Sequence, residues 1–349
     1  MSIRPWVVLV GGFLGAGKTT LLLAAVRELE TRGLRSAMIL NDQDHSLVDS
    51  ELASLHHVQH GAVTGGCFCC RFSQLIEVIE SLRLHAPDVI FAEPVGSCTD
   101  ISATTLHPLL ELGDAYCVAP YTVLVDPLRA ETLLHEDADP NLSFLFKKQL
   151  QEADLICLTK SDICPTAPTI PAQSVRQISA RSGQGVAAWL DEVLSGQLSS
   201  GSFLLEIDYE QYARAEAALA WLNAKASIDL RNPASPAFVL GPLLQSLDAD
   251  LTAARIQTVH LKAIVQAETG YVKAAMLANG QDPAVEGILD ASPARHHELL
   301  LNLRAVGRAD SLKEIVQRNL MAVDGDASSV SISCFHPAPP HPERRVRRD

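Results

Sequence analysis

Short apolar runs alternate with helical patterns over the first 195 residues of the chain. These runs contain few polar residues and lie at residues 6–10, 36–40, 89–92, 121–125, 155–158 and 175–178. Uninterrupted apolar runs of this length are typical of strands that are buried on both faces of a parallel sheet. Because helices are expected between them, the pattern predicts an α/β domain with a doubly wound, mostly parallel sheet over residues 1–195.

A smaller second domain is expected after a Gly- and Ser-rich linker at residues 194–202. The elements expected beyond the linker are a strand at 203–208, an Ala-rich helix at 209–223, a turn at Pro233 and Pro236, strands at 256–266, 271–277 and 298–305, and a helix at 310–320. This order predicts an α+β domain with a mostly antiparallel sheet over residues 203–323. Residues 324–349 are rich in Gly, Ser, Pro and Arg, and we expect them to form a poorly ordered tail.

Composition and charge narrow the classes of partner. The 349 residues exceed the size at which a single core stops growing, which agrees with two domains. The formal net charge of −13 repels phosphate backbones, so nucleic acid is not expected as a partner. No apolar run reaches the roughly 18 residues of a membrane-spanning helix, so no membrane partner is expected either. Three of the eight cysteines cluster tightly, which favours metal binding over disulfides. The same cluster favours a cytoplasmic location, where thiols stay reduced.

The sequence GFLGAGKT at residues 12–19 matches the P-loop pattern and lies between a predicted strand and a predicted helix at 20–30. Its glycines let backbone N–H groups and the helix N-terminus face phosphates. The expected phosphate-binding residues are Gly12, Gly15, Ala16, Gly17, Lys18, Thr19 and Thr20. We expect Lys18 to act in catalysis at the β- and γ-phosphates, and the Thr19 hydroxyl to bind Mg²⁺.

A second nucleotide element follows the predicted strand at residues 89–92, which ends in Glu93. This is the layout of a Walker B carboxylate, so Glu93 is expected either to support Mg²⁺ or to orient the attacking water. Gly96 is expected to offer its N–H to the γ-phosphate. The alternative is that Glu93 only caps the next helix.

The sequence TKSD at residues 159–162 follows a predicted strand and is similar to the Asn-Lys-X-Asp guanine motif of GTPases, with Thr in the first position. Asp162 would accept hydrogen bonds from guanine groups that adenine lacks. Lys160 of the same motif is also expected to contact the nucleotide. Ser179 and Ala180 follow the next strand, where GTPases carry a loop that reads guanine O6. Together these residues favour GTP over ATP, because specificity comes from paired polar groups.

Cys67, Cys69 and Cys70 place three thiols within four residues. Thiolates at this density suit Zn²⁺ or another thiophilic ion, and the fourth position stays open to water, a carboxylate, a histidine or a client protein. The alternative is a set of reduced cysteines that are only packed. The other five cysteines, Cys98, Cys117, Cys157, Cys164 and Cys334, are scattered and are expected to have no metal role.

The motifs GGFLGAGKTT, GCFCC, EPVG and TKSD, in this order, resemble those of the CobW family of P-loop GTPases and metallochaperones. The resemblance covers residues 1–195 closely and the second domain in outline. It implies hydrolysis of GTP to GDP and phosphate with Mg²⁺, and binding of Zn²⁺ or Co²⁺ by Cys67, Cys69 and Cys70. It also implies delivery of that metal to a client metalloprotein or to an enzyme of cofactor synthesis.

The chain departs from the family at residues 41–45, which read NDQDH where the family usually has Asn-Glu-Phe-Gly-Glu. The His-rich stretch of some members is absent, and only His336 and His341 lie in the tail. Three alternatives stay open: a P-loop kinase or phosphotransferase acting on a small molecule, a metal-binding scaffold with a structural nucleotide site, and a GTPase whose cysteines serve another purpose, such as redox chemistry. No side chain in the sequence is an obvious arginine finger, so basal hydrolysis is expected to be slow and to rise with metal or a partner.

Overall fold

The computed structural model describes residues 4–42, 48–164, 170 and 175–347 of the chain. The chain divides into two compact units. The first comprises Met1–His45, Asp49–Ala215 and Pro339–Asp349, and the second comprises Ser46–Val48 and Glu216–Ala338. Within the described residues, no helix is both long and apolar enough to cross a membrane.

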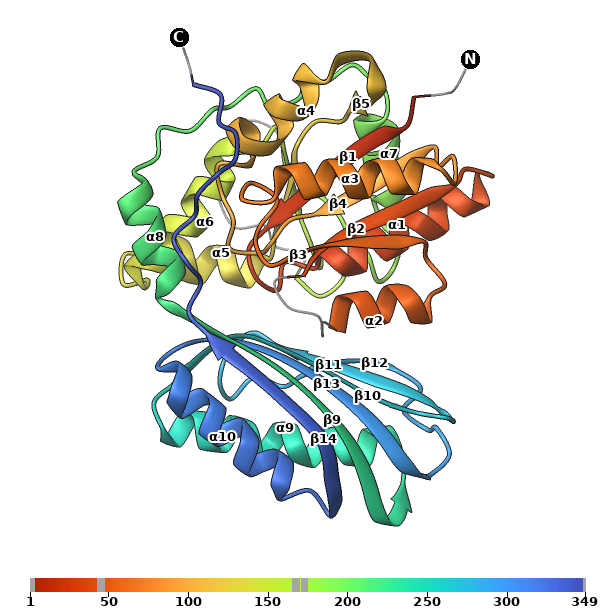
Figure 1. The fold of residues 1–349 in the computed structure, drawn as a ribbon, viewed down its shortest axis with the longest axis vertical. Helices are drawn as coiled ribbons and strands as arrows, with labels where there is room; N and C mark the ends of the chain where they lie inside the picture. Colours follow the sequence, from red (N-terminus) through yellow and green to blue (C-terminus); the bar gives the residue numbers. More distant parts are fainter. Residues whose placement is uncertain (1–3, 43–47, 165–169, 171–174, 348–349) are drawn as a thin grey trace. The chain divides into compact units, whose positions relative to one another are not determined.

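The first unit is built on a parallel sheet, which confirms the predicted fold class (Figure 1). Its strands are β1 (Trp6–Gly12), β2 (Ser36–Asp42), β3 (His60–Thr64), β4 (Val89–Glu93), β5 (Cys117–Val118), β6 (Thr122–Val125), β7 (Leu155–Leu158) and β8 (Val175–Gln177). They are arranged in the order β3-β2-β4-β1-β6-β7-β8, and β5 pairs with the first half of β1. The central strands are buried on both faces, as their uninterrupted apolar sequences require.

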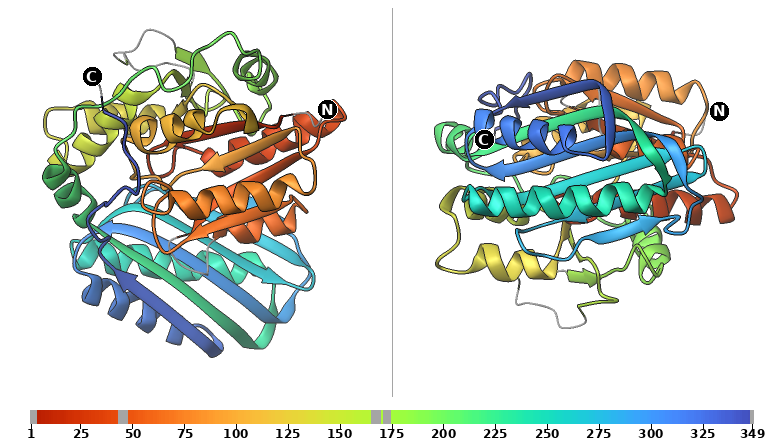
Figure 2. Two further views of the ribbon diagram at one scale, coloured as in Figure 1. Left: turned by 45° about the horizontal axis from the view of Figure 1, so that its top comes forward. Right: turned by 90° about the horizontal axis from the view of Figure 1, so that it is seen from below.

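Helices cover both faces of this sheet. They are α1 (Lys18–Thr31), α2 (Val48–Leu55), α3 (Phe72–Arg83), α4 (His107–Glu111), α5 (Pro127–Leu134), α6 (Pro140–Glu152), α7 (Val186–Val193) and α8 (Tyr209–Ala217). The helices α1 and α7 pack together on one face, and α3 and α6 lie on the other, as Figures 1 and 2 show. Because all the strands are parallel, the segments that follow β1, β4, β7 and β8 leave the sheet at the same edge.

The second unit is an antiparallel sheet with two helices on one face, which also agrees with the prediction. Its elements are β9 (Leu219–Ala234), α9 (Pro236–Ala253), β10 (Gln257–Ala267), β11 (Gly270–Met276), β12 (Ala284–Gly287), β13 (Ala294–Val306), α10 (Ala309–Met321) and β14 (Gly325–Phe335). The strand order is β12-β11-β10-β13-β9-β14. The helices α9 and α10 lie side by side (Figure 2), and one apolar core joins them to the sheet.

Several segments differ from the prediction. Residues 203–208 form no strand, and residues 219–223 belong to β9 instead of a helix. This strand pairs with β13 on one side and β14 on the other, and two ladders outweigh the helix propensity of its alanines. The expected linker packs into the first unit, because the Asp154 carboxylate accepts hydrogen bonds from the N–H groups of Gly201 and Ser202, both at 2.7 Å.

The largest difference concerns residues 324–349, which were expected to be poorly ordered. The segment opens with β14, an edge strand of the second sheet, and residues from Pro339 onward belong to the first unit. The composition of the segment indicated neither the strand nor the packing against the first unit, because both depend on contacts with residues far away in the sequence. The helix α9 was also not predicted, since Pro233 and Pro236 indicated a turn, whereas Pro236 is the first residue of this helix and Pro242 lies inside it.

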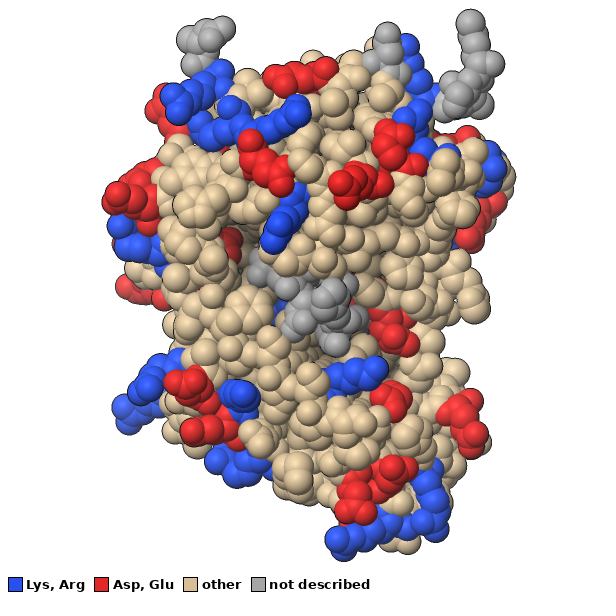
Figure 3. Space-filling model, in the orientation of Figure 1, with Lys and Arg blue, Asp and Glu red and all other residues tan. Residues whose placement is uncertain are grey.

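Charged side chains are interspersed on the surface. Figure 3 shows acidic and basic side chains scattered over one face, with several basic side chains close together near the top of the view.

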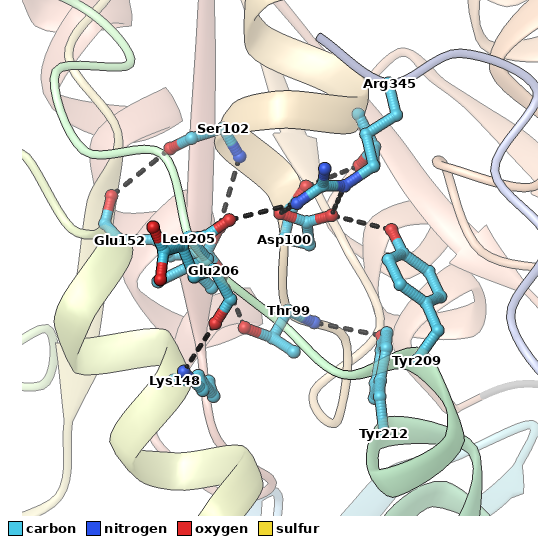
Figure 4. Close-up of polar contacts among 11 residues, drawn as sticks. Thr99, Asp100, Ser102, Lys148, Glu152, Leu205, Glu206, Tyr209, Tyr212 and Arg345 are labelled. Atoms are coloured by element: carbon cyan, nitrogen blue, oxygen red, sulfur yellow. Dashed lines mark hydrogen bonds and ion pairs between the residues drawn. The ribbon is translucent and has the colours of Figure 1, made fainter. Parts of the chain in front are cut away.

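A fully buried carboxylate ends the helix α6. Glu152 accepts hydrogen bonds from the Thr99 hydroxyl at 3.0 Å and from the Ser102 N–H at 3.1 Å, as Figure 4 shows. Burial, which penalises the charged form, raises the pKa of Glu152 to about 8. The folded protein therefore keeps a proton on this group at pH values at which the unfolded chain has released it.

This difference predicts that the first unit loses stability as the pH rises. The unfolded carboxyl ionises near pH 4.5, so its contribution is full below that value and is lost on the way to about pH 8, at up to about 1.4 kcal/mol per pH unit. Thermal unfolding of Glu152→Gln should show a flatter pH dependence than the wild type between about pH 5 and 8. Parallel curves for the two proteins would contradict this assignment.

Candidate functional site

The P-loop residues lie in the turn between β1 and α1. Gly12 has a positive φ of 132°, and a Cβ there would collide with the carbonyl oxygen of Leu124. Gly17, with a φ of 92°, directly precedes the helix. Lys18 is buried, and its amine donates to the Gly12 carbonyl oxygen at 2.9 Å and lies 3.9 Å from a Glu93 oxygen. The loop therefore holds its cation beside the acidic end of β4.

Two carboxylates converge on the hydroxyl of Thr19. Its Oγ1 lies 2.9 Å from Oε2 of Glu93 and 2.8 Å from Oδ1 of Asp49. The Thr19 hydroxyl has one proton, so it donates to only one of these two carboxylates at a time. Three converging oxygens are the donor set that Mg²⁺ prefers, and the residues present therefore fit this ion.

Asp49 was missed in the sequence. It lies in the first turn of α2, and the only local signal is that Asp49 and Glu51 are both acidic in a helix that follows the second strand. The stretch at residues 42–45, where the family resemblance placed its usual carboxylates, lies outside the described residues apart from the backbone of Asp42.

Gly96 lies against the P-loop. A Cβ on Gly96 would stand 2.9 Å from Cδ2 of Leu14 and 3.0 Å from Nζ of Lys18, so only glycine fits without displacing the P-loop lysine. The loop is held from behind by Gln149 of α6, whose amide donates to the carbonyl oxygens of Gly96 at 3.0 Å and Cys98 at 2.8 Å. Glu93 thus lies next to both Thr19 and Lys18, and Gly96 lies next to Lys18.

The predicted guanine-reading residues come together on adjacent loops. The N–H of Ser161 donates to the Ile178 carbonyl oxygen at 3.4 Å, which joins the loop after β7 to the end of β8. The Lys160 amine contacts the Asp126 carboxylate, while Asp162 is exposed. The Ser179 N–H donates to the Gln184 carbonyl oxygen at 2.9 Å, and Ala180 follows at the surface of this loop. Guanine reading by these residues stays a prediction.

The three clustered cysteines occupy a short loop between β3 and α3. Their sulfur atoms all lie within 4.8 Å of one another, and Cys67 and Cys69 are buried while Cys70 is half-buried. Asn41, at the end of β2, fixes the loop: its amide donates to the Gly66 carbonyl oxygen at 2.6 Å and its carbonyl oxygen accepts from the Phe68 N–H at 3.0 Å. The thiols are therefore brought together before any ion binds.

Comparison with known proteins places the chain in a family. Residues 6–184, more than half of the chain, match the model of the CobW/HypB/UreG nucleotide-binding domain. The chain belongs to the CobW/HypB/UreG family. It is similar to the zinc chaperone YjiA of Escherichia coli K12, with 30% identity over 204 residues that cover 57% of this chain and 63% of YjiA. It is also similar to the zinc chaperone CobW of Pseudomonas aeruginosa, with 27% identity over 186 residues that cover 45% of this chain and 48% of that protein.

The matches thus span from about half to less than two thirds of the length of these curated relatives. Among solved structures, HypB of Helicobacter pylori in complex with nickel covers 57% of this chain and 92% of HypB, with 15% identity and a TM-score of 0.44. The Zn(II)-bound YjiA GTPase of E. coli covers 90% of this chain and 97% of YjiA, with 15% identity and a TM-score of 0.32.

Within this CobW/HypB/UreG domain, the thiols have unequal pKa values. Hydrogen bonds from Cys69, Cys70 and Cys98 lower the pKa of Cys67 well below its usual range. The same hydrogen bonding to Cys67 raises the pKa of Cys69, and raises that of Cys70 to about 11. Cys67 is therefore the thiol that carries negative charge first.

Cys98 was expected to have no metal role, and that expectation stays untested, but Cys98 lies closer to the cluster than its place in the sequence indicates. It lies in the loop after β4, is buried, and hydrogen-bonds with the thiols of Cys67 and Cys69. No local pattern in the sequence indicates this contact, because Cys98 lies 28 positions after Cys70, the last cysteine of the cluster. The group of sulfur atoms that lie within 4.8 Å of one another contains Cys67, Cys69 and Cys70 but not Cys98 or the other four cysteines, in the part of the chain that the structure describes.

If Asp49 belongs to the Mg²⁺ site, Asp49→Asn should raise the Mg²⁺ concentration required for binding of a non-hydrolysable GTP analogue by about tenfold, because a charged oxygen ligand is lost. A fluorescent analogue titrated with Mg²⁺ measures this requirement. Glu51→Gln, in the same turn of α2, is the matched control and should behave as the wild type. An unchanged Mg²⁺ requirement in Asp49→Asn would remove Asp49 from the site.

Proposed function

We propose that this protein is a GTP-hydrolysing metallochaperone. In this proposal, binding and hydrolysis of Mg-GTP are coupled to the binding of Zn²⁺ or Co²⁺ and to its transfer to a client protein or a cofactor pathway. The observation that carries the proposal is the preformed group of three thiols in the same unit as the complete P-loop contacts of Lys18, Thr19 and Glu93. Membership in the family and the names of the zinc chaperones to which the chain is similar support it.

The two ion sites are separated by their chemistry. Oxygen atoms of Thr19, Glu93 and Asp49 suit the hard Mg²⁺ ion, whereas thiolates select a softer ion such as Zn²⁺. The transition metal is the cargo of the protein, held by Cys67, Cys69 and Cys70. The cytoplasm is the proposed compartment, because its reducing conditions keep thiols available for metal.

Hydrolysis would depend on positioning and electrostatics, as phosphoryl transfer generally does. Lys18 is placed to neutralise charge between the β- and γ-phosphates, and Glu93 to support Mg²⁺ or orient water. Gly96, Lys160, Asp162, Ser179 and Ala180 complete the proposed GTP site. We expect basal turnover to be slow and to rise with metal or a client.

The test is a titration of the reduced full-length protein with Zn²⁺ and Co²⁺, with and without Mg²⁺ and a non-hydrolysable GTP analogue. Cys67→Ala should weaken metal binding at least about tenfold, because it removes a ligand that is readily deprotonated. Cys334→Ala, outside the cluster, is the control and should bind as the wild type. In the wild type the nucleotide should shift the metal affinity.

Two results would count against the proposal. One is an absence of metal binding, and the other is binding that is indifferent both to Cys67 and to the nucleotide. Rapid GTP turnover by the purified protein without metal or client would contradict the expected gating.

A further inference from the structure

We propose that Cys98 is a fourth thiolate ligand, so that the transition metal is held by four cysteines from two separate loops. This inference rests on the proposed function and names one more residue of the same site. Cys67, Cys69 and Cys70 come from the loop after β3, and Cys98 comes from the loop after β4.

The position of Cys98 supports this role. Its side chain is 4% exposed and makes hydrogen-bonding contact with the thiols of Cys67 and Cys69. A buried cysteine usually contacts apolar neighbours, where it acts as a small hydrophobic side chain. Here Cys98 instead contacts two of the three clustered thiols, and four thiolates are the donor set of a closed tetrahedral Zn²⁺ site.

The backbone on both sides of Cys98 is fixed by buried hydrogen bonds. Its carbonyl oxygen accepts from Gln149 at 2.8 Å, and its N–H donates to the Val95 carbonyl oxygen at 3.0 Å. The next N–H, that of Thr99, donates to the hydroxyl of Tyr212 at 3.1 Å. The thiol is therefore held by the structure and does not reach the cluster by a chance rotamer of an exposed loop.

The same loop contacts the nucleotide site. Gly96 lies two residues before Cys98 and packs against Leu14 and the Lys18 amine. A group that binds at Lys18 and displaces Gly96 also displaces Cys98, because Gln149 holds the two carbonyl groups together. Cys98 thus provides a physical reason for the metal affinity to depend on the nucleotide.

Co²⁺ binding to the reduced full-length protein tests the role of Cys98. In Cys98→Ala, the thiolate-to-cobalt charge-transfer absorption should fall by about a quarter, one ligand in four, and the affinity should fall at least about tenfold. The affinity shift caused by the GTP analogue should also be lost. Cys157→Ala, which removes an equally buried thiol from β7, is the matched control and should retain all three properties.

A second measurement does not depend on the folding of Cys98→Ala. X-ray absorption of the Zn²⁺-loaded wild type gives the number of sulfur ligands around the ion. Four sulfur ligands support the proposal, and three overturn it. Cys98→Ala with wild-type absorption and affinity overturns the role of Cys98 alone, provided that Cys67→Ala loses metal. Failure of the wild type to bind metal overturns this inference together with the proposed function.

A separate set of contacts points to a second inference, that residues 341–346 form a strap over the cysteine loop. The N–H of Glu343 donates to the Cys69 carbonyl oxygen at 3.0 Å, and the N–H of His341 donates to the sulfur of Cys70 at 3.3 Å. The Glu343 carboxylate accepts from the Ser73 N–H at 2.8 Å and from its hydroxyl at 2.7 Å. This carboxylate therefore caps the N-terminus of α3 from the far end of the chain.

A buried ion pair anchors the strap. Arg345 donates to the Asp100 carboxylate at 2.7 Å, and the Tyr209 hydroxyl donates to the same group at 2.6 Å, as Figure 4 shows. Asp100 is only 1% exposed, so a charge that is otherwise costly to bury is paired by the tail. The N–H of Val346 adds a hydrogen bond to the Ala103 carbonyl oxygen at 2.9 Å.

We infer that the strap restricts access to the thiols, above all to the half-buried Cys70. Deletion of residues 339–349 should increase the rate at which a disulfide-type thiol reagent modifies metal-free protein at Cys70, by at least about tenfold. Glu343→Ala should cause a smaller increase, because it removes only the contact with Ser73. Arg347→Ala, at an exposed position of the same segment, is the control. Modification of Cys70 at the wild-type rate in the deletion variant would overturn the strap.

Discussion

The two hydrogen bonds that Gln149 donates are the constraint on which the nucleotide and thiol sites depend. Gln149 is 1% exposed and uses both protons of its amide on the carbonyl oxygens of Gly96 and Cys98. Leaving a buried carbonyl group without a partner costs about 1–3 kcal/mol, so both bonds strongly favour one conformation of the loop. That conformation sets Gly96 against the P-loop lysine and Cys98 against the other thiols.

In the proposed function, ligand chemistry keeps the two metal ions in separate sites of one domain. The oxygen donors Thr19, Glu93 and Asp49 come from the helices and strand around the P-loop, whereas the sulfur donors come from the loops after β3 and β4. Hard ions prefer oxygen ligands and soft ions prefer sulfur ligands. This preference gives selectivity in addition to the general order of affinity among divalent metal ions. The fold places the loops that follow the parallel strands at the same end of the sheet, and the side chains on each loop determine which ligand binds there.

The parts of the structure that the sequence predicted are those whose signal is local. Short stretches of about ten residues are enough to recognise a buried parallel strand, a P-loop or a Cys-X-Cys-Cys motif. Asp49 contacts Thr19, and Cys98 contacts Cys67, from other segments of the chain, so neither spacing nor composition identified these contacts. The same reason accounts for the tail, where Glu343 and Arg345 find partners at Ser73 and Asp100. Residues 219–223 were misassigned because pairing on both sides of β9 outweighs their local preference.

The run from Glu93 to Asp100 joins three regions that are far apart in the sequence. Its first residue contacts Thr19, its middle contacts the clustered thiols, and its last residue pairs with Arg345 of the tail. Buried polar groups along the run all find partners at fixed positions, so a shift at one end leaves bonds unmade unless the rest follows. Thermodynamic linkage then works in every direction: whatever the nucleotide does to the thiols or the tail, those regions do to the nucleotide.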